Sequence, residues 1–180
     1  MNIWNAEDFY PTPESLLDKI TAGIDWRKVG TVLEPSAGKG NIAEYCKRQC
    51  KRQTYRDYLD VDCVEINDEL QKTLRGKELR VVHDDFLTFH TFKHYDLIIM
   101  NPPFSEGDLH LLHAIEMCEN GGQIACILNA ETLRNPYTNS RRLLAKKLND
   151  VGASIRFIND AFAKAERKAK VDVALVNISI

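Results

Sequence analysis

Short apolar runs alternate with amphipathic stretches along most of the chain, and this alternation limits the possible folds more than any other feature. Seven runs are typical of strands, at residues 31–33, 59–65, 79–82, 95–100, 122–128, 154–158 and 171–180. Helical patterns lie between them, at residues 41–52, 67–74, 109–119 and 141–148. Such alternation favours an α/β fold with a mostly parallel seven-stranded sheet and helices on both faces. Because only residues 159–170 separate the last two runs, we expect one strand to be antiparallel.

The composition is that of an ordinary globular protein. The chain has 180 residues, of which 44% are hydrophobic and 28% are charged, so we expect a single domain over residues 1–180. The net charge of −2 argues against a protein that coats nucleic acid by itself. No apolar run approaches the ~20 residues of a membrane span, and residues 1–8 lack the features of a secretory signal. Cys63 and Cys126 lie in strand-like runs, which favours buried, reduced thiols and a cytoplasmic protein.

A rigid corner follows the strand-like run at 95–100. Its sequence is Asn101-Pro102-Pro103-Phe104, and the prolines fix φ and lack an N–H group. In open α/β sheets, ligands bind at the carboxyl ends of strands. The Asn101 side-chain oxygen and the Pro102 carbonyl could together accept both hydrogens of an exocyclic –NH2 group, while Phe104 stacks on a planar base. The same residues could also form only a turn.

A glycine-containing loop follows the run at 31–33. Gly38 and Gly40 allow a tight turn and the close approach of a ligand, and the next helix would present its first N–H groups there. The loop lacks the Gly-Lys-Ser/Thr of a Walker A motif, and Ala43 occupies the third glycine position of a dinucleotide fingerprint. By itself it could therefore be a plain strand–helix turn.

Acidic residues end the next two strand-like runs. Glu65 could accept both hydroxyls of a ribose, or it could be a solvated loop residue. Asp85 could accept from an adenine amino group while Phe86 packs on the ring. Because parallel strands end at the same edge of a sheet, we expect these loops to lie side by side.

Together these motifs resemble those of class I S-adenosylmethionine-dependent methyltransferases that act on amino groups, most closely the N6-adenine DNA methyltransferases. The matching segments are Leu33–Gly40 (motif I), Val64–Glu65 (motif II), Asp85–Phe86 (motif III), Asn101–Phe104 (motif IV) and Phe9–Pro13 (motif X). The resemblance covers nearly the whole chain and implies a Rossmann-like fold. Independently, the last segment predicts a helix start, with Thr12 as N-cap and Pro13 as the first helical residue.

The resemblance also implies the site and its chemistry. S-adenosyl-L-methionine would be the cofactor, and its methyl group would pass directly from the sulfonium to the amino nitrogen without a histidine base. The residues implied in catalysis are Asn101, Pro102, Pro103 and Phe104. Those implied in cofactor binding are Tyr10, Thr12, Pro13, Glu34, Pro35, Ser36, Ala37, Gly38, Gly40, Asn41, Glu65, Ile66, Asp85, Phe86 and Asn101.

The implied substrate is a nucleic acid, with N6 of adenine in DNA favoured over RNA. DNA methyltransferases usually add a target-recognition domain, for which this sequence has no room. We therefore expect substrate contacts from the segment 131–140, from a partner chain, or from a domain of a longer protein. The basic group Lys164, Arg167 and Lys168 is a candidate for phosphate contact, although such groups are often only solvated helix faces.

Other functions stay open at this stage. The same Asn-Pro-Pro-aromatic motif occurs in methyltransferases that act on RNA adenine or on a protein glutamine, and a cofactor-binding, non-catalytic subunit would also retain the fold. A metal site is not expected, because His110 and His113 have no accompanying C-x-x-C or H-E-x-x-H motif. No membrane partner is expected either.

Overall fold

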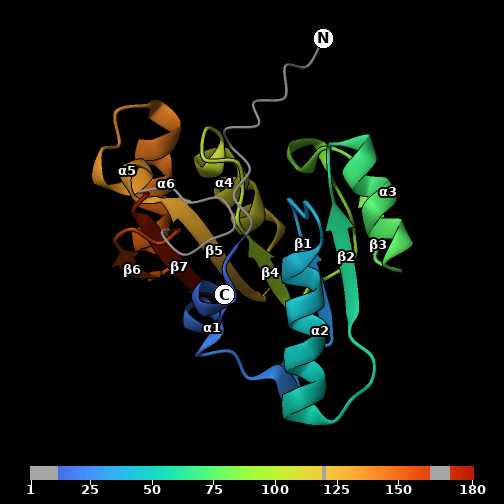
Figure 1. Cartoon of the computed structure of the whole chain (residues 1–180). Helices are drawn as coiled ribbons and strands as arrows, with labels where there is room; N and C mark the ends of the chain where they lie inside the picture. Colours follow the sequence, from blue (N-terminus) through green and yellow to red (C-terminus); the bar gives the residue numbers. More distant parts are fainter. Residues whose placement is uncertain (1–11, 119–120, 163–170) are drawn as a thin grey trace.

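Seven strands form one sheet in the computed structural model, which describes residues 12–118, 121–162 and 171–180. Their order is β3-β2-β1-β4-β5-β7-β6 (Figure 1). The strands are β1 (Thr31–Glu34), β2 (Asp60–Val64), β3 (Arg80–His83), β4 (Leu97–Met100), β5 (Gln123–Asn129), β6 (Ser154–Ile158) and β7 (Val173–Ser179). Strands β1 to β5 pair in parallel, and β7 runs antiparallel to both β5 and β6. The expected single antiparallel strand is therefore confirmed.

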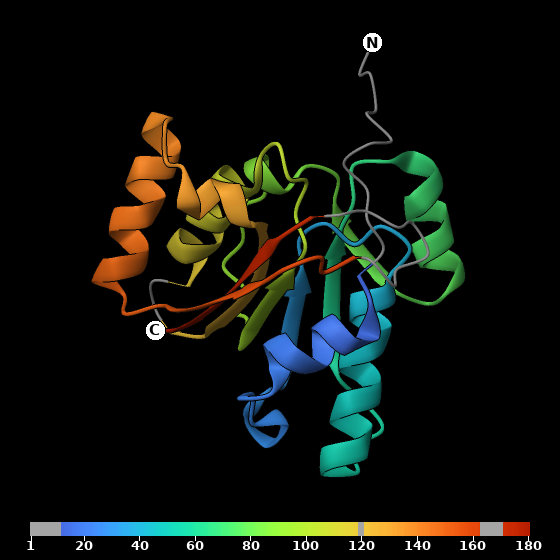
Figure 2. The same cartoon turned by 60° about the vertical axis from the view of Figure 1, so that its left-hand side comes forward.

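Helices cover both faces of the sheet (Figures 1 and 2). The α-helices are α1 (Glu14–Thr21), α2 (Asn41–Thr54), α3 (Asp68–Gly76), α4 (Gly107–Met117), α5 (Ala130–Arg134) and α6 (Asn139–Asp150). Two short 3-10 helices are η1 (Trp26–Lys28) and η2 (Phe86–Thr88). Successive strand residues alternate between the faces, so Leu97 and Ile99 pack with α1 and α2, whereas Ile98 and Met100 pack with α4 and α6. Among the described residues, none of the helices is long and apolar enough to cross a membrane.

The chain reverses its direction across the sheet between β1 and β4. From β1 the chain adds β2 and then β3 on one side, and β4 followed by β5 lies on the other. Val32 pairs with Leu97 and Leu33 with Ile98, so β1 and β4 are direct neighbours. Their carboxyl ends therefore flank the topological switch point, where doubly wound sheets bind ligands.

The amino edge of the sheet is held by a compact charge network around Asp62. Tyr95 donates to its Oδ2 (2.8 Å), Lys93 donates to the same oxygen (2.7 Å), and Arg80 donates to Oδ1. Burial opposes ionisation of Asp62, but these hydrogen bonds outweigh it and hold its pKa below the ordinary value. The network occupies the edge opposite to the glycine loop.

One local prediction differs from the structure, and one helix was not predicted. Helix α1 begins at Glu14 with Pro13 as N-cap, so the prediction that Thr12 caps this helix is wrong. Instead, the Pro13 carbonyl accepts from Leu16 N and Leu17 N. Helix α5 was not predicted, because five residues are too few to show a helical period.

Candidate active site

The glycine loop joins β1 to α2 and is fixed to the end of β2. Ala37 N donates to the Val64 carbonyl (3.0 Å), and Gly40 N donates to the Ala37 carbonyl (2.7 Å). Gly38 (φ +53°) and Gly40 (φ +83°) both have left-handed conformations, which glycine adopts at little cost. The backbone conformation of this loop therefore accounts for the glycines at positions 38 and 40.

Gly40 has a second structural requirement that the sequence did not reveal. A Cβ at this position would lie 2.5 Å from Leu79 Cδ1 and 2.9 Å from Leu74 Cδ2. Gly40 thus lets the start of α2 pack against α3 and the residue before β3. This contact explains Gly40 without a ligand, so its predicted part in cofactor binding stays a prediction.

Glu65 braces the glycine loop from the end of β2. Its side chain is only 5% exposed, so the alternative of a solvated loop residue is wrong. Oε2 accepts from Gly38 N (2.7 Å) and Oε1 from Asn67 N (2.9 Å). Burial raises the pKa of the Glu65 carboxyl, while these backbone hydrogen bonds partly oppose the rise. A carboxylate has about four acceptor positions, so the two bonds leave capacity for the ribose contact that we predict.

Glu34 lies beneath the same loop and is 1% exposed. Its Oε2 accepts from Ala43 N (2.9 Å), one of the first N–H groups of α2. Burial raises the pKa of Glu34 well above its ordinary value, the hydrogen bond from Ala43 opposes this, and the nearby Glu65 charge adds to it. In the structure Glu34 therefore acts as a buried cap for α2, and a direct cofactor contact stays a prediction.

Asn101 follows β4 and connects the rigid corner to the amino-terminal segment. Its Nδ2 donates to Thr12 Oγ1 (3.0 Å), which brings together two predicted site residues 89 positions apart. Because the amide nitrogen is directed at Thr12, the amide oxygen is the acceptor arm of the Asn101 side chain. Pro102 is buried, and Pro103 and Phe104 are half-buried.

Phe104 is supported by an aromatic contact with Phe162. The ring centroids are 6.1 Å apart with an interplanar angle of 64°, an edge-to-face arrangement. Phe162 is fully buried, so it forms a fixed wall beside Phe104. The predicted residues Tyr10, Lys164, Arg167 and Lys168 lie outside the described part of the chain.

The Asp85–Phe86 segment forms the start of η2 at the end of β3. Asp85 Oδ1 accepts from Leu87 N (2.9 Å) and caps this short helix. Phe86 is only 2% exposed, and its ring centroid lies 4.9 Å from that of His113 and 5.6 Å from that of His110. Burial lowers the pKa of His110. Phe86 thus belongs to the core beneath the site, and its contact with an adenine ring stays a prediction.

The remaining predicted residues vary in accessibility. Ile66 is 52% exposed and follows Glu65 directly, whereas Pro35 and Ala37 are buried, Ser36 is half-buried, and Asn41 is exposed at the first position of α2. Within the described residues, no group of three or more His, Cys, Asp or Glu side chains could hold a metal ion.

Asp108 was not predicted, and Ser140 was predicted only as part of the segment 131–140, although the two residues connect the elements around the rigid corner. Ser140 Oγ donates to Asp108 Oδ2 (2.6 Å), which joins the first turn of α6 to the first turn of α4. Asp108 is 7% exposed. An acidic residue in the first turn of this helix was the only signal in the sequence, and it does not identify a partner 32 residues away.

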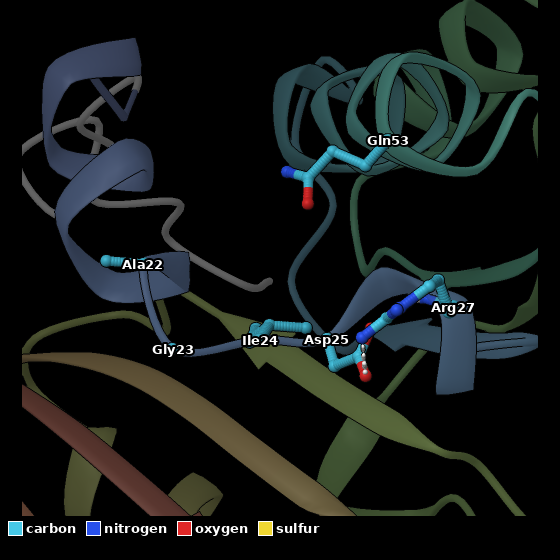
Figure 3. Close-up of a pocket in the computed structure, with 6 residues that line it drawn as sticks. All are labelled: Ala22, Gly23, Ile24, Asp25, Arg27 and Gln53. Carbon is cyan, nitrogen blue, oxygen red and sulfur yellow. Dashed lines mark hydrogen bonds and ion pairs between the residues drawn. The ribbon is translucent and has the colours of Figure 1, made fainter.

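A separate hollow of about 440 Å³ lies between α1, η1 and the end of α2 (Figure 3). It is lined by Ala22, Gly23, Ile24, Asp25, Arg27 and Gln53. Five of these residues precede β1 and Gln53 lies at the far end of α2, so the hollow lies toward the amino edge of the sheet, away from the glycine loop and Asn101. Its charged groups, Asp25 and Arg27, pair with each other at 2.8 Å.

Comparison with known proteins agrees with the architecture. A family model described as "Methyltransferase small domain" matches residues 11–132. A search of curated proteins finds no significant match. The type I restriction-modification methyltransferase subunit from Streptococcus thermophilus superposes with a TM-score of 0.71 and 17% identity over 94% of this chain and 44% of that chain.

Two other solved structures are similar. The modification subunit of a putative type I restriction enzyme from Vibrio vulnificus YJ016 gives a TM-score of 0.70 and 15% identity over 98% of this chain and 45% of that one. A dimethyladenosine transferase from Plasmodium falciparum gives a TM-score of 0.66 and 16% identity over 96% of this chain and 64% of that chain. The chain thus spans less than half of the two restriction-system subunits. At these identities the likeness establishes the fold, and the expected Rossmann-like α/β class is confirmed.

Proposed function

Because the chain belongs to the methyltransferase small domain family, we propose that it methylates an exocyclic amino nitrogen, with N6 of adenine in DNA as the preferred acceptor. Its cofactor is S-adenosyl-L-methionine. The observation that carries the proposal is the Asn101 corner, which ends β4 directly beside the glycine loop that ends β1. We further propose that residues 1–180 form one catalytic domain.

The residues at this edge fit the cofactor. Glu65 would accept from the ribose hydroxyls, the exposed side chain of Ile66 would pack on the adenine, and Asp85 would accept from its amino group. Thr12, which is bonded to Asn101, would contact the methionine end. When bound, the cofactor supplies an electrophilic methyl group on its sulfonium. All of these residues lie at the ends of adjacent strands or are bonded to one of them.

The chain's own contribution is to prepare the amino nitrogen. The lone pair of an exocyclic amine is delocalised into its ring, so this amine is a weak nucleophile. The Asn101 amide oxygen and the Pro102 carbonyl would accept its two hydrogens and favour a tetrahedral nitrogen with an outward lone pair. The Thr12 bond supports this role, because it engages the nitrogen of the Asn101 amide and so makes the oxygen the acceptor arm.

Phe104 would hold the base by stacking, worth roughly 1–3 kcal/mol. Its edge-to-face contact with Phe162 supports this role, because a fixed ring loses little conformational freedom when the base binds. In duplex DNA the adenine must first be flipped out of the helix, at a cost of a few kcal/mol. The type I restriction-system neighbours support a nucleic acid substrate and a partner chain or further domain for target recognition.

The decisive experiment is incubation with labelled S-adenosylmethionine and separate pools of DNA, RNA and protein, followed by nucleoside and amino-acid analysis. We expect N6-methyldeoxyadenosine from the DNA pool. Label in the RNA pool would favour RNA adenine, a second candidate supported by the dimethyladenosine transferase neighbour. Label in protein would identify a glutamine-type acceptor, and no label in any pool would favour the non-catalytic subunit.

Asn101→Ala tests the proposed catalytic residue. We expect transfer to be abolished while cofactor affinity, measured by calorimetry, changes little. Asn149→Ala, at an exposed position near the end of α6, makes the same chemical change away from the site and should keep full activity. Continued methylation of the preferred substrate by the Asn101→Ala variant would show that the amide has no catalytic role.

A further inference from the structure

We propose that Tyr137, Arg141 and Arg142 form a contact surface for the backbone of the nucleic acid substrate. We call these residues the arginine cluster. The proposal rests on the proposed function, because it assumes a nucleic acid substrate. Tyr137 lies in the segment 131–140, from which the sequence already suggested substrate contacts, whereas for the phosphates the sequence suggested Lys164, Arg167 and Lys168 rather than Arg141 and Arg142 at the start of α6.

The arginine cluster lies at the same edge of the sheet as the Asn101 corner. It follows α5, which continues directly from the carboxyl end of β5, the neighbour of β4 (Figure 1). The hydrogen bond from Ser140 to Asp108 fixes the start of α6 to the first turn of α4. That helix begins at Gly107, three residues after Phe104. The cluster is therefore held at a fixed position relative to the corner.

The side chains of the cluster are arranged around an exposed aromatic ring. Tyr137 is 65% exposed, and the Arg141 guanidinium carbon lies 4.7 Å from the centre of its ring. Arg142 donates from Nη1 to the Tyr137 carbonyl (2.9 Å) and from Nη2 to Asn139 Oδ1 (2.7 Å). Both guanidinium groups are therefore ordered before a ligand arrives, which lowers the entropy lost on binding.

The charges of the cluster are not compensated by carboxylates. Among the described residues, neither Arg141 nor Arg142 has an Asp or Glu oxygen within 4.0 Å, whereas the nearby Arg134 pairs with Asp172 at 2.8 Å. Both arginines also lie in the first turn of α6, which contains no acidic residue. Cations at this end of a helix are disfavoured by about 0.3–1 kcal/mol each. A bound anion would offset this unfavourable free energy, because its negative charge is attracted both by the two guanidinium groups and by the amino end of the helix.

These properties fit a phosphate backbone better than other partners. Guanidinium groups bind phosphate oxygens through paired hydrogen bonds, and an exposed tyrosine can stack on an unpaired base. A single-stranded substrate exposes unpaired bases beside the target base. An acidic protein surface would satisfy only the charges and would leave the ring of Tyr137 without a matching group.

Salt-dependent binding tests the proposal. The double variant Arg141→Gln/Arg142→Gln is compared with Lys146→Gln/Lys147→Gln, which removes the same charge farther along the same helix. Fluorescence anisotropy with a labelled DNA duplex gives the slope of log K against log [salt]. Loss of two phosphate contacts should reduce the magnitude of this slope by about 1.8. If the variant and the wild type bind equally at 1 M salt, the variant should then bind roughly 60-fold more weakly than the wild type at 0.1 M salt. The lysine variant should keep the wild-type slope.

Two further measurements separate contact from folding. Arg141→Lys/Arg142→Lys keeps both charges and should keep most of the slope, while Tyr137→Ala should weaken binding of single-stranded more than of duplex DNA. Cofactor affinity should be unchanged in every variant, and thermal unfolding should stay cooperative. The proposal would be overturned by an unchanged slope in the glutamine double variant, by an equal loss of slope in the Lys146→Gln/Lys147→Gln control, or by failure of the wild-type protein to bind DNA or RNA. Binding of the arginine cluster to an acidic protein would then be the remaining explanation.

The two proposals can fail separately. If the wild-type protein methylates no nucleic acid but its DNA binding still depends on Arg141 and Arg142, the proposed function is wrong and the contact surface stands. If the DNA pool is methylated and the glutamine double variant shows the same KM and salt slope as the wild type, the contact surface is wrong and the proposed function stands.

Discussion

Replacement of Glu65 by alanine separates its observed structural contacts from its predicted cofactor contact. The side chain accepts from Gly38 N (2.7 Å) and Asn67 N (2.9 Å), and the substitution would leave both N–H groups without this acceptor. Each buried, unsatisfied group costs about 1–3 kcal/mol, or about 2–6 kcal/mol for both. Part of this loss is offset, because burial already disfavours the Glu65 charge and raises its pKa. We therefore expect a net loss of roughly 1–4 kcal/mol of unfolding free energy.

Cofactor affinity should fall more than the loop contacts alone would explain. A hydroxyl bonded to a charged acceptor contributes about 1.5–3 kcal/mol, which corresponds to about 10- to 150-fold in affinity. Glu65→Gln keeps the side-chain shape and one acceptor oxygen, but its –NH2 group must face one of the two N–H donors. We expect the order wild type, Glu65→Gln, Glu65→Ala in both stability and affinity.

The assays are urea unfolding without cofactor and titration calorimetry with S-adenosylmethionine. Asp68→Ala, an exposed acidic residue three positions along the chain, is a matched control for the loss of one carboxylate. Unfolding of Glu65→Ala at the wild-type urea concentration would refute the loop-bracing argument. Unchanged cofactor affinity in a variant that is folded would place the ribose elsewhere.

Two further predictions concern buried polar groups near the sheet. The pKa of Glu34 is raised above the ordinary 4.5 in the folded protein, so the unfolding free energy should fall as the pH rises above about 4.5. Glu34→Gln should flatten this pH dependence and be more stable than the wild type at pH 8. Urea unfolding measured between pH 4.5 and pH 8 tests both expectations. A variant with the full pH dependence would exclude Glu34 as its source. Thr132→Val should leave stability unchanged or raise it by up to about 1–3 kcal/mol, because Thr132 Oγ1 is buried without a hydrogen-bond partner among the described residues. Thr21→Val is the control and should destabilise, since Thr21 Oγ1 bonds to Leu17 O and Tyr45 Oη; equal effects in both variants would contradict the argument.

The strands could be predicted closely because several local signals agree at each of them. The run at 154–158 coincides with β6, and the run at 95–100 contains β4, which begins at Leu97. Buried parallel strands appear in the sequence as continuous apolar runs. The boundaries of two of them are marked by turn residues: β5 begins after Gly121–Gly122, and β4 ends before Asn101 and the two prolines that follow it. Helix α5 escaped prediction because its five residues are determined by the position of β5 and α6 rather than by a period of their own.

The site could be predicted only as a set of residues at one edge. Residue types at strand ends indicated a ligand site, but not which acceptor faces which donor. Glu34 and Glu65 both accept backbone N–H groups, a use that depends on the path of the loop above them. The bond between Thr12 and Asn101 joins residues 89 positions apart, so it depends on the sheet topology.

Substrate choice depends on the positions of individual groups around the site, which the amino-acid composition does not reveal. The Asn101 corner would accept any planar –NH2 group, so discrimination between DNA, RNA and protein must come from surfaces around it. The net charge of −2 argues against unaided coating of nucleic acid, yet salt screens interactions between charges that lie more than about 8–10 Å apart. A phosphate beside Arg141 and Arg142 therefore experiences those two guanidinium groups much more strongly than the excess of carboxylates elsewhere. Local charge at the carboxyl edge, rather than the total, determines whether this domain binds a nucleic acid there.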